Sequence, residues 1–313
     1  MMMRTIGVLI VASLFVADIA CAESLRVGRP SARGFAGVPL VTGVKHGFFA
    51  KEGLDLELSV FGGGKTSQAM TAGGVDISVQ SGTEMAFLAK GVPAKAVAAL
   101  AGPPNELVLV VRPDLPVTSA ADLKGRSIGV TGPSLTGWLV SEVSRQQGWG
   151  PGGIKMNYAP PAASWALMKT KAIDGIVTDL GSALQAERNG DGRILLSFGK
   201  NMEDFHVFVA VASNDLIKSR PNAVRGFLKA WLDTIAFMRA DKAASVAVQI
   251  ELQEVDADIA NRTYDQVMPE FSADGRFNDK ALAVLARSFV ALDYLPKEPD
   301  MKALYTEEFL PKR

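Results

Sequence analysis

The sequence predicts an α/β protein of two lobes, each built on a mostly parallel sheet covered by helices. Short apolar runs alternate with amphipathic helical segments along most of the chain, which is typical of such sheets. Residues 107–136, LVLVVRPDLPVTSAADLKGRSIGVTGPSLT, join a strand, a Pro-rich exit, a helical turn, a second strand and a helix start. That order indicates a chain passing from one α/β unit into another. From Asp215 onward the pattern is nearly all helical.

Residues 1–22 are predicted to be a secretory signal peptide. Arg4 precedes an uncharged run over 5–17, and a small-residue site ends at Ala22. The run is shorter than the roughly 20 apolar residues that a membrane-spanning helix needs. Lipidation of Cys21 is the alternative, but Asp18 is a poor fit to the aliphatic residue usual at that position. We therefore expect a periplasmic protein released by cleavage.

Composition narrows the function classes. Cleavage of the leader removes the single cysteine, so the mature chain has no disulfide, thiolate nucleophile or cysteine-based metal site. We expect no cofactor. The 33 basic and 33 acidic residues balance, and the leader carries one of each, so the net charge of zero argues against a nucleic-acid partner. About 290 mature residues leave room for two compact domains.

The first unit is expected to hold five strands and three helical segments. Strands are predicted at 25–28, 54–61, 77–79, 96–101 and 107–112. Helices are predicted at 38–46, 66–72 and 84–90.

The second unit is expected to hold strands at 128–130, 173–178 and 193–198, with helices at 135–147 and 180–189. A buried strand, Phe205 to Ala212, then returns to the first unit. We predict that it forms a hinge with the strand at 107–112, and that the helical C-terminal third completes the first lobe. The predicted lobes are 23–112 plus 206–313 for lobe 1, and 113–205 for lobe 2.

Seven segments carry a resemblance to a known family. They are GFFAKEGLDLEL from Gly47, GGGKTSQAM from Gly62, GVDI from Gly74, VTSAADLKG from Val117, AIDGI from Ala172, FSADGRF from Phe271 and LYTEEFL from Leu304. Together, in order and spacing, they make the chain resemble the periplasmic solute-binding proteins of ABC importers. The resemblance is to the branch for nitrate, taurine, aliphatic sulfonates and thiamine-precursor pyrimidines.

The resemblance implies a type II periplasmic-binding-protein fold and a transport function. Two lobes would close on a small organic anion or zwitterion, such as a sulfonate, a nitrate-like anion, a pyrimidine or an aromatic acid. The closed form, a monomer, would then dock on a membrane permease.

An enzyme of the same fold is the alternative. The family relation extends to fungal thiamine-pyrimidine synthases, which rely on a Cys-rich motif and an active-site histidine. The mature chain has no cysteine, only His46 and His206, and neither an H-E-x-x-H nor a G-x-S-x-G motif. We therefore expect a binding protein rather than an enzyme.

Candidate ligand contacts lie in loops that follow strands, because open α/β sheets bind ligands beyond the carboxyl ends of their strands. The first loop is 29–37, where Arg33 is a candidate charge clamp and Phe35 a candidate apolar wall. Solvation of Arg33 and core burial of Phe35 are the alternatives.

The second loop is the glycine-rich turn at 62–66. Gly63 would allow close backbone approach, Lys65 would pair with an anion, and Thr66 would either cap the next helix or contact the ligand. A nucleotide-binding P-loop is excluded because Ser59 stands where that motif needs glycine.

The third and fourth loops each combine hydroxyl groups with a helix start. Ser81, Gly82 and Thr83 form one, and Ser134 and Thr136 lie in the other. The loop at 131–136 is suited to an anion, whereas the loop at 81–84 also carries the carboxylate of Glu84; helix capping is the alternative to ligand contact for each.

Aromatic residues and one carboxylate complete the predicted site. Trp138, Trp165 and Phe205 are candidate walls of the cleft, with core packing as the alternative. Asp179, at the end of a strand, would accept from a ligand amine or cap the next helix. His206 is interpreted as structural.

Overall fold

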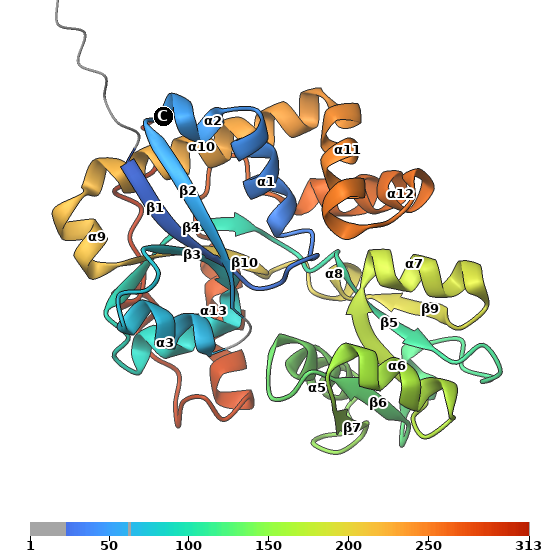
Figure 1. Ribbon diagram of the computed structural model, residues 1–313. Coiled ribbons are helices and arrows are strands. Elements are labelled where there is room, and N and C mark those ends of the chain that lie inside the picture. The colour runs from blue at the N-terminus through green and yellow to red at the C-terminus, as the bar shows by residue number, and fades with distance from the viewer. Residues whose placement is uncertain (1–22, 62–63, 313) are drawn as a thin grey trace, which may run out of the picture.

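The fold consists of two sheet-centred lobes, seen in a computed structural model that describes residues 23–61 and 64–312. The expected leader, with Cys21, lies outside these residues, as does Gly63. Figure 1 shows the two lobes side by side, with the first third of the chain and the C-terminal helices in one and the middle of the chain in the other. Each lobe contains one five-stranded sheet; the second sheet has two strands more than the three predicted for that unit, at residues 107–111 and 155–158.

The strands follow the predicted alternation. They are β1 (Glu23–Arg29), β2 (Leu54–Val60), β3 (Ile77–Ser81), β4 (Ala94–Ala101), β5 (Leu107–Val111), β6 (Ser127–Val130), β7 (Lys155–Tyr158), β8 (Gly175–Asp179), β9 (Arg193–Ser197) and β10 (Phe208–Ser213).

The helices lie between and after the strands. The α-helices are α1 (Gly37–Lys45), α2 (Phe48–Lys51), α3 (Lys65–Thr71), α4 (Ala86–Ala89), α5 (Leu135–Gln146), α6 (Pro161–Lys169), α7 (Leu180–Asn189), α8 (Phe198–Asn201), α9 (Asn214–Ser219), α10 (Pro221–Ala240), α11 (Lys242–Gln253), α12 (Ala257–Val267) and α13 (Asp279–Ala291). Four short 3₁₀ helices are η1 (Gly82–Met85), η2 (Ala120–Leu123), η3 (Met268–Glu270) and η4 (Met301–Ala303).

The two sheets share one topology. In the first, the order is β2-β1-β3-β10-β4, with β1 parallel to β2 and β3, and β10 antiparallel to β3 and β4. In the second, the order is β7-β6-β8-β5-β9, with β6 parallel to β7 and β8, and β5 antiparallel to β8 and β9. In each sheet one antiparallel strand lies between parallel neighbours. The carboxyl ends of the parallel strands, and the loops that follow them, lie at the edge that faces the other lobe.

One detail of the predicted organisation is wrong. The strand at 107–111 belongs to the second sheet, not the first, and it pairs with β8 and β9 rather than with the returning strand β10. The reason is that Pro103 and Pro104, which cannot donate to a sheet ladder, precede this strand and already break the chain. The lobes are therefore joined by residues 102–106 and 202–207, and Val207 N–H donates to Gly102 O over 2.9 Å.

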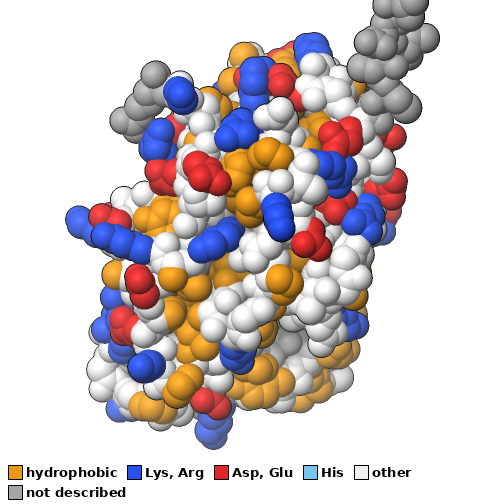
Figure 2. Space-filling view, turned by 90° about the vertical axis from the view of Figure 1, so that its left-hand side faces the viewer, with side chains coloured by type: hydrophobic (Ala, Val, Ile, Leu, Met, Phe, Trp, Pro, Cys, Tyr) orange, Lys and Arg blue, Asp and Glu red, His pale blue; other side chains and the backbone are white. Residues whose placement is uncertain are grey.

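The C-terminal helices pack mainly on the first lobe, as predicted. Helix α10 buries one face against α1 and α2, with Trp231 and Phe227 among its fully buried side chains. Helix α12 also contacts α7 of the second lobe, where Arg188 and Asp256 form an ion pair. Positive and negative side chains are interspersed over the face in Figure 2. Among the described residues, no helix has the length and apolar character to cross a membrane.

Candidate functional site

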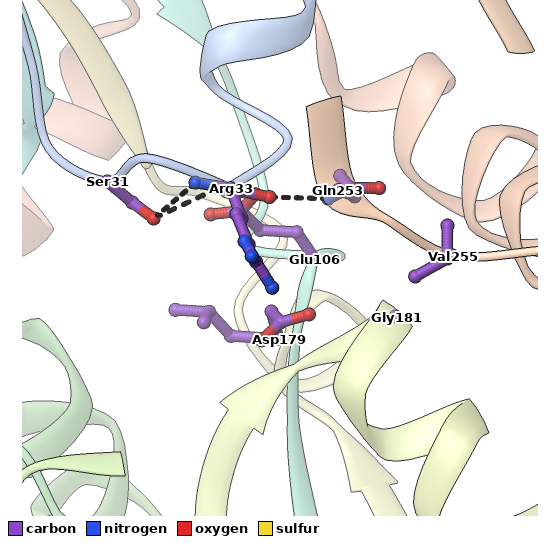
Figure 3. A pocket seen from close by; sticks show the side chains of 9 residues that line it. Ser31, Arg33, Glu106, Asp179, Gly181, Gln253 and Val255 are labelled. Atoms are coloured by element: carbon purple, nitrogen blue, oxygen red, sulfur yellow. Dashed lines mark hydrogen bonds between the residues drawn. The ribbon is translucent and has the colours of Figure 1, made fainter. Parts of the chain in front are cut away.

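A cavity of about 220 Å³ lies between the lobes. Figure 3 shows that side chains from both lobes and from the outgoing crossing converge on it. It is lined by Ser31, Arg33, Gly34, Glu106, Leu107, Asp179, Gly181, Gln253 and Val255. The sequence-predicted residues Arg33 and Asp179 are therefore brought together, although they are far apart in the chain.

The lobe 1 wall is a turn that follows β1. Ser31 Oγ accepts hydrogen bonds from the backbone N–H groups of Arg33, over 3.3 Å, and Gly34, over 3.0 Å. Gln253, at the end of α11, donates to Arg33 O over 2.9 Å and holds the turn from the other side. The Arg33 guanidinium points toward Asp179 in Figure 3 and forms an exposed ion pair with Glu254, 2.6 Å away.

The lobe 2 wall is the start of α7. Asp179 caps this helix, because its Oδ1 accepts from Ser182 N–H over 2.9 Å and its Oδ2 accepts from the Ser182 hydroxyl over 2.7 Å. The sequence left helix capping and ligand contact as alternatives for Asp179. In the structure the residue caps α7 and also lines the cavity. Gly181, one residue into the first turn, leaves room beside the carboxylate.

Glu106, in the outgoing crossing, is the charged lining residue that sequence reasoning missed, together with Leu107, Gln253 and Val255. It lines the cavity although only 9% of it is exposed, and its Oε2 has no hydrogen-bond partner in the part of the chain that the structure describes. Burial, with the charge of Asp179 as the smaller cause, raises the pKa of Glu106 to about 8. Its only sequence signal was a glutamate placed directly before the apolar strand LVLVV.

Glu270 lies behind Glu106 and extends the acidic group into lobe 1. It is also buried, and one of its carboxylate oxygens accepts from Asn105 N–H over 3.0 Å. Burial, together with the charge of Glu106, raises the pKa of Glu270 well above its usual range. The cavity is therefore backed by two carboxyl groups that favour their protonated forms while it remains unoccupied.

The lobes also contact each other at the start of the second lobe's helix α5. The Tyr294 hydroxyl, just after α13, donates to Pro133 O over 2.5 Å. Burial, and to a lesser degree the charge of Glu84, raises the pKa of Tyr294 to about 12. Glu84 is itself buried with Oε2 lacking a partner among described residues, and burial raises its pKa to about 7. This contact joins the two rims of the cleft.

The loop at 131–136 forms a cluster of hydroxyl groups. The Thr131 Oγ1 lies 3.0 Å from the Ser134 Oγ and 2.9 Å from the Thr136 Oγ1, and the last two are 3.2 Å apart. Ser134 is the residue before α5, but its side chain makes no capping hydrogen bond. The predicted capping alternative therefore does not describe Ser134, and the hydroxyl groups satisfy one another.

Three predicted aromatic contacts are in the core. Phe35 is 1% exposed and packs against Phe271, with ring centroids 5.8 Å apart. Trp138 and Phe205 stack on each other at 5.0 Å with an interplanar angle of 14°, and both are buried. The stack joins α5 to the returning crossing, so these rings fix the relation of the lobes. Trp165 is half-buried in a separate surface hollow with Met168 and Asp191.

The two glycine- and hydroxyl-containing loops of lobe 1 differ in exposure. Lys65 is exposed, and Thr66 is buried inside α3, with Gly64 rather than Thr66 at the N-cap position. Thr66 instead donates to Phe61 O over 3.3 Å. The expectation that Thr66 caps the helix is therefore wrong, because the helix begins one residue earlier.

The loop after β3 packs on the returning crossing. The Ser81 and Thr83 hydroxyl groups lie 2.9 Å apart. Gly82 donates from its N–H to Val207 O over 3.1 Å, and a side chain at this position would meet the carbonyl oxygen of His206 at 2.1 Å. Glycine is therefore required here for close approach, not for flexibility. Among the described residues, no group of three or more His, Cys, Asp and Glu side chains is placed to hold a metal ion.

Residues 35–245 match the family model described as NMT1/THI5 like. A search of curated protein sequences gave no significant match. Many solved structures have a similar fold. Their sequence identity to this chain is low, so the likeness establishes the fold alone.

Two of these structures are sulfonate-binding proteins. The periplasmic aliphatic sulphonate binding protein SsuA from Escherichia coli has a TM-score of 0.78 and 19% identity, covering 91% of this chain and 92% of that one. The alkanesulfonate-binding protein SsuA from Xanthomonas axonopodis pv. citri, bound to MOPS, has a TM-score of 0.77 and 18% identity, covering 90% and 98%. They confirm the two-lobed periplasmic-binding-protein fold that the sequence resemblance implied.

An enzyme shares the fold as well. The desulfurization enzyme DSZB has a TM-score of 0.65 and 17% identity, covering 92% of this chain and 97% of that one. Binding proteins and at least one enzyme therefore share this architecture, and the residues in the cleft decide between the two functions.

Proposed function

The chain belongs to the NMT1/THI5-like family, and from that premise we propose that it is the extracytoplasmic solute-binding component of an ABC importer. It captures a small organic anion or zwitterion between its lobes and delivers it to a membrane permease. The protein acts in the periplasm after its leader is removed. The observation that carries the proposal is the cavity whose walls come from both lobes and from the crossing between them.

A cavity in that position couples binding to lobe closure. A ligand that contacts Arg33 in lobe 1 and Asp179 in lobe 2 stabilises the arrangement in which both walls are close together. The permease would then recognise that arrangement. The Trp138–Phe205 stack and the Tyr294–Pro133 hydrogen bond are the contacts that closure must keep or form.

The lining favours a small, polar ligand. A volume of about 220 Å³ is below the 300 Å³ or more that drug-sized ligands occupy. One guanidinium group and two carboxyl groups face the same space, which suits a ligand that carries both charge signs. A sulfonated amine or another amino acid-like zwitterion has that character.

Binding, rather than catalysis, fits the residues of the cleft. Residues 23–312 contain no cysteine, and their two histidines, His46 and His206, do not line the cavity. His206 is buried, with Nε2 accepting from Asn278 N–H over 3.0 Å. No nucleophile with an adjacent base is therefore present among the residues that line the cavity.

Native mass spectrometry of the protein freshly isolated from its host tests the proposal. We expect one small molecule to travel with the protein, and its mass to identify the ligand class. A thermal-shift panel of sulfonates, nitrate, pyrimidines, carboxylates and aromatic acids provides the second measurement. The proposal fails if the native protein carries no small molecule and no compound in the panel raises the melting temperature.

A further inference from the structure

Resting on the function proposed above, we propose that Glu106 and Asp179 form a subsite for a protonated amine carried by the ligand. The transported molecule would then be a zwitterion or an amine, not a simple anion. The inference depends on three features of the cavity: an unpartnered buried carboxyl group, a second carboxylate on the neighbouring strand, and a shortage of cations among the lining residues.

The carboxyl group of Glu106 is the first feature. Nine-tenths of the residue is buried, it lines the cavity, and its Oε2 has no hydrogen-bond partner in the described chain. A buried polar atom without a partner is costly, so natural proteins retain one mainly where something else satisfies it. The residue borders the cavity, so a small change in its side-chain torsions would bring the buried Oε2 within reach of a ligand donor there.

Asp179 supplies the second acceptor, on the neighbouring strand: Leu107, next to Glu106, pairs with Asp179, and Leu180 N–H donates to Glu106 O over 2.8 Å. Its cap on α7 fixes the orientation of the carboxylate, because Ser182 binds one oxygen through N–H and the other through its hydroxyl. Each carboxylate oxygen has two lone pairs, so both oxygens still accept from a ligand. An ammonium group has three N–H donors, enough to donate to both carboxyl groups.

The charges around the cavity leave the two carboxyl groups uncompensated. Arg33 is the one base among the lining residues, and its guanidinium is already paired with Glu254 at 2.6 Å. Glu270, behind Glu106, adds a third acidic group rather than a cation. A cationic ligand group would therefore favour ionisation of Glu106 beside Asp179, and the resulting charge pair would hold the ligand.

A structural role for the acidic pair is the competing explanation. Glu106 and Glu270 would then share a proton and stabilise the crossing by a hydrogen bond between their carboxyl groups. The structure gives no such bond: Glu106 Oε2 and Glu270 Oε1 both lack a partner within residues 23–61 and 64–312. The same residues offer no metal-binding group, so an organic cation is the ligand chemistry that the site suits.

Matched pairs of probes test the inference by calorimetry. The pairs are taurine and ethanesulfonate, β-alanine and propionate, and 2-aminoethylphosphonate and ethylphosphonate, which differ within each pair only by the amine. We expect the amine-bearing member of at least one pair to bind at least about tenfold more tightly than its partner. Near pH 7 its binding should also release protons, because a nearby ammonium group lowers the pKa of Glu106. The release is measured as a dependence of the binding enthalpy on the ionisation enthalpy of the buffer.

Two isosteric variants locate the effect. Glu106→Gln removes one charge, and Asp179→Asn removes the other while keeping a residue that caps α7 well. We expect each variant to reduce the preference for the amine to about threefold or less, and Glu106→Gln to abolish the proton release. Glu298→Gln, at an exposed position away from the cavity, is the matched control and should change neither. Circular dichroism confirms that each variant is folded.

Each outcome has a distinct meaning. Amine preference that is lost in both variants supports the subsite. Equal or tighter binding of the amine-free member in every pair that binds overturns the subsite and leaves the transport function standing. Unchanged amine preference in Glu106→Gln also overturns it, and indicates that Glu106 and Glu270 are a structural pair. If none of the six probes binds and the native protein carries no small molecule, the proposed function fails together with the inference.

Discussion

Buried ionisable residues around the cleft give this protein opposing pH dependences. Burial lowers the pKa of His206 to about 4, whereas it raises those of Glu84 and Glu106 to about 7 and 8. Each shift penalises the charged form of the residue, so the neutral forms dominate inside the fold. At the residue scale, the pH dependence of stability therefore involves one group on the cavity wall, Glu106, and two that do not line the cavity, Glu84 and His206.

His206 should make the protein less stable in mild acid. Its folded-state pKa lies below the usual value of 6.5, so the unfolded chain binds more protons between about pH 4 and 6.5. Stability contributed by neutral His206 is then lost as pH falls through this window, by up to about 3 kcal/mol. His206→Gln keeps an acceptor for Asn278 N–H and cannot be protonated there. Urea denaturation at pH 4.5 and 7 should show a smaller difference for the variant, and an equal difference would contradict the assignment.

Glu106 should act in the opposite direction. Its raised pKa means that its contribution to stability is fully present below about pH 4.5 and lost as pH rises toward 8. The Glu106→Gln variant has a neutral side chain at both pH values. Its unfolding free energy relative to wild type should therefore be higher at pH 8 than at pH 4.5, by a few kcal/mol in the ligand-free protein. Denaturant midpoints of wild type and variant at the two pH values measure this. A pH-independent offset between the two proteins would show that the Glu106 carboxyl is not strained by burial.

At the scale of secondary-structure elements, the loops that border the cleft are held by close backbone contacts. The loop after β3 packs on the returning crossing through Gly82, and the turn after β1 is fixed by Ser31 and Gln253. Both loops follow strands of the first sheet, and the Gly82 contact connects the second of them to the returning crossing, so a change in that loop is transmitted to the lobe junction.

Gly82→Ala tests the tightness of that packing. The added methyl group would lie 2.1 Å from His206 O, a distance that requires the crossing or η1 to move. We expect a loss of roughly 3 kcal/mol in unfolding free energy, as for overpacked cores. Gly64→Ala is the control, because its nearest neighbour would be Phe87 at 3.5 Å, and its stability should stay within about 1 kcal/mol of wild type. Similar losses in both variants, measured by urea denaturation, would argue against the close contact.

At the scale of the whole molecule, the two lobes are joined by two short crossings and by contacts on either side of the cavity. On one side α12 meets α7 through the Arg188–Asp256 ion pair. On the other, Tyr294 donates to Pro133 O and the Trp138 ring stacks on Phe205. Because these contacts between the lobes are few, each one should contribute measurably to the free-energy difference between open and closed arrangements. Replacing a single residue should therefore change the populations of the two arrangements.

Tyr294→Phe should shift the molecule toward the open arrangement. The variant loses the hydrogen bond to Pro133 O but keeps the ring that packs on Phe87, 5.2 Å away. A loss of about 1 kcal/mol corresponds to roughly a fivefold change in the open-to-closed ratio. Small-angle X-ray scattering should show a larger radius of gyration than for wild type. Tyr305→Phe is the control, because Tyr305 packs against Phe277 within lobe 1, and it should leave the radius unchanged. Equal radii for Tyr294→Phe and wild type would show that the Tyr294–Pro133 hydrogen bond does not hold the lobes together.

The sequence by itself determined the fold class, the two units and the helical completion of the first lobe, because apolar periodicity and turn residues act locally. It also placed Arg33 and Asp179 after strands, where loops of both lobes meet. It misplaced the strand at 107–111, since strand pairing depends on distant partners and both Pro103 and Pro113 were suitable boundaries.

Tertiary structure alone decided which side chains face the cavity. Glu106 has no local pattern that distinguishes it, and only the meeting of three segments buries its carboxyl group without a partner. Phe35, Trp138 and Phe205 are aromatic residues at loop or helix starts, and their burial against other rings follows from long-range packing that one segment does not encode. Local sequence thus specifies elements and strand ends, whereas charge environment and burial arise only when segments distant in sequence come into contact.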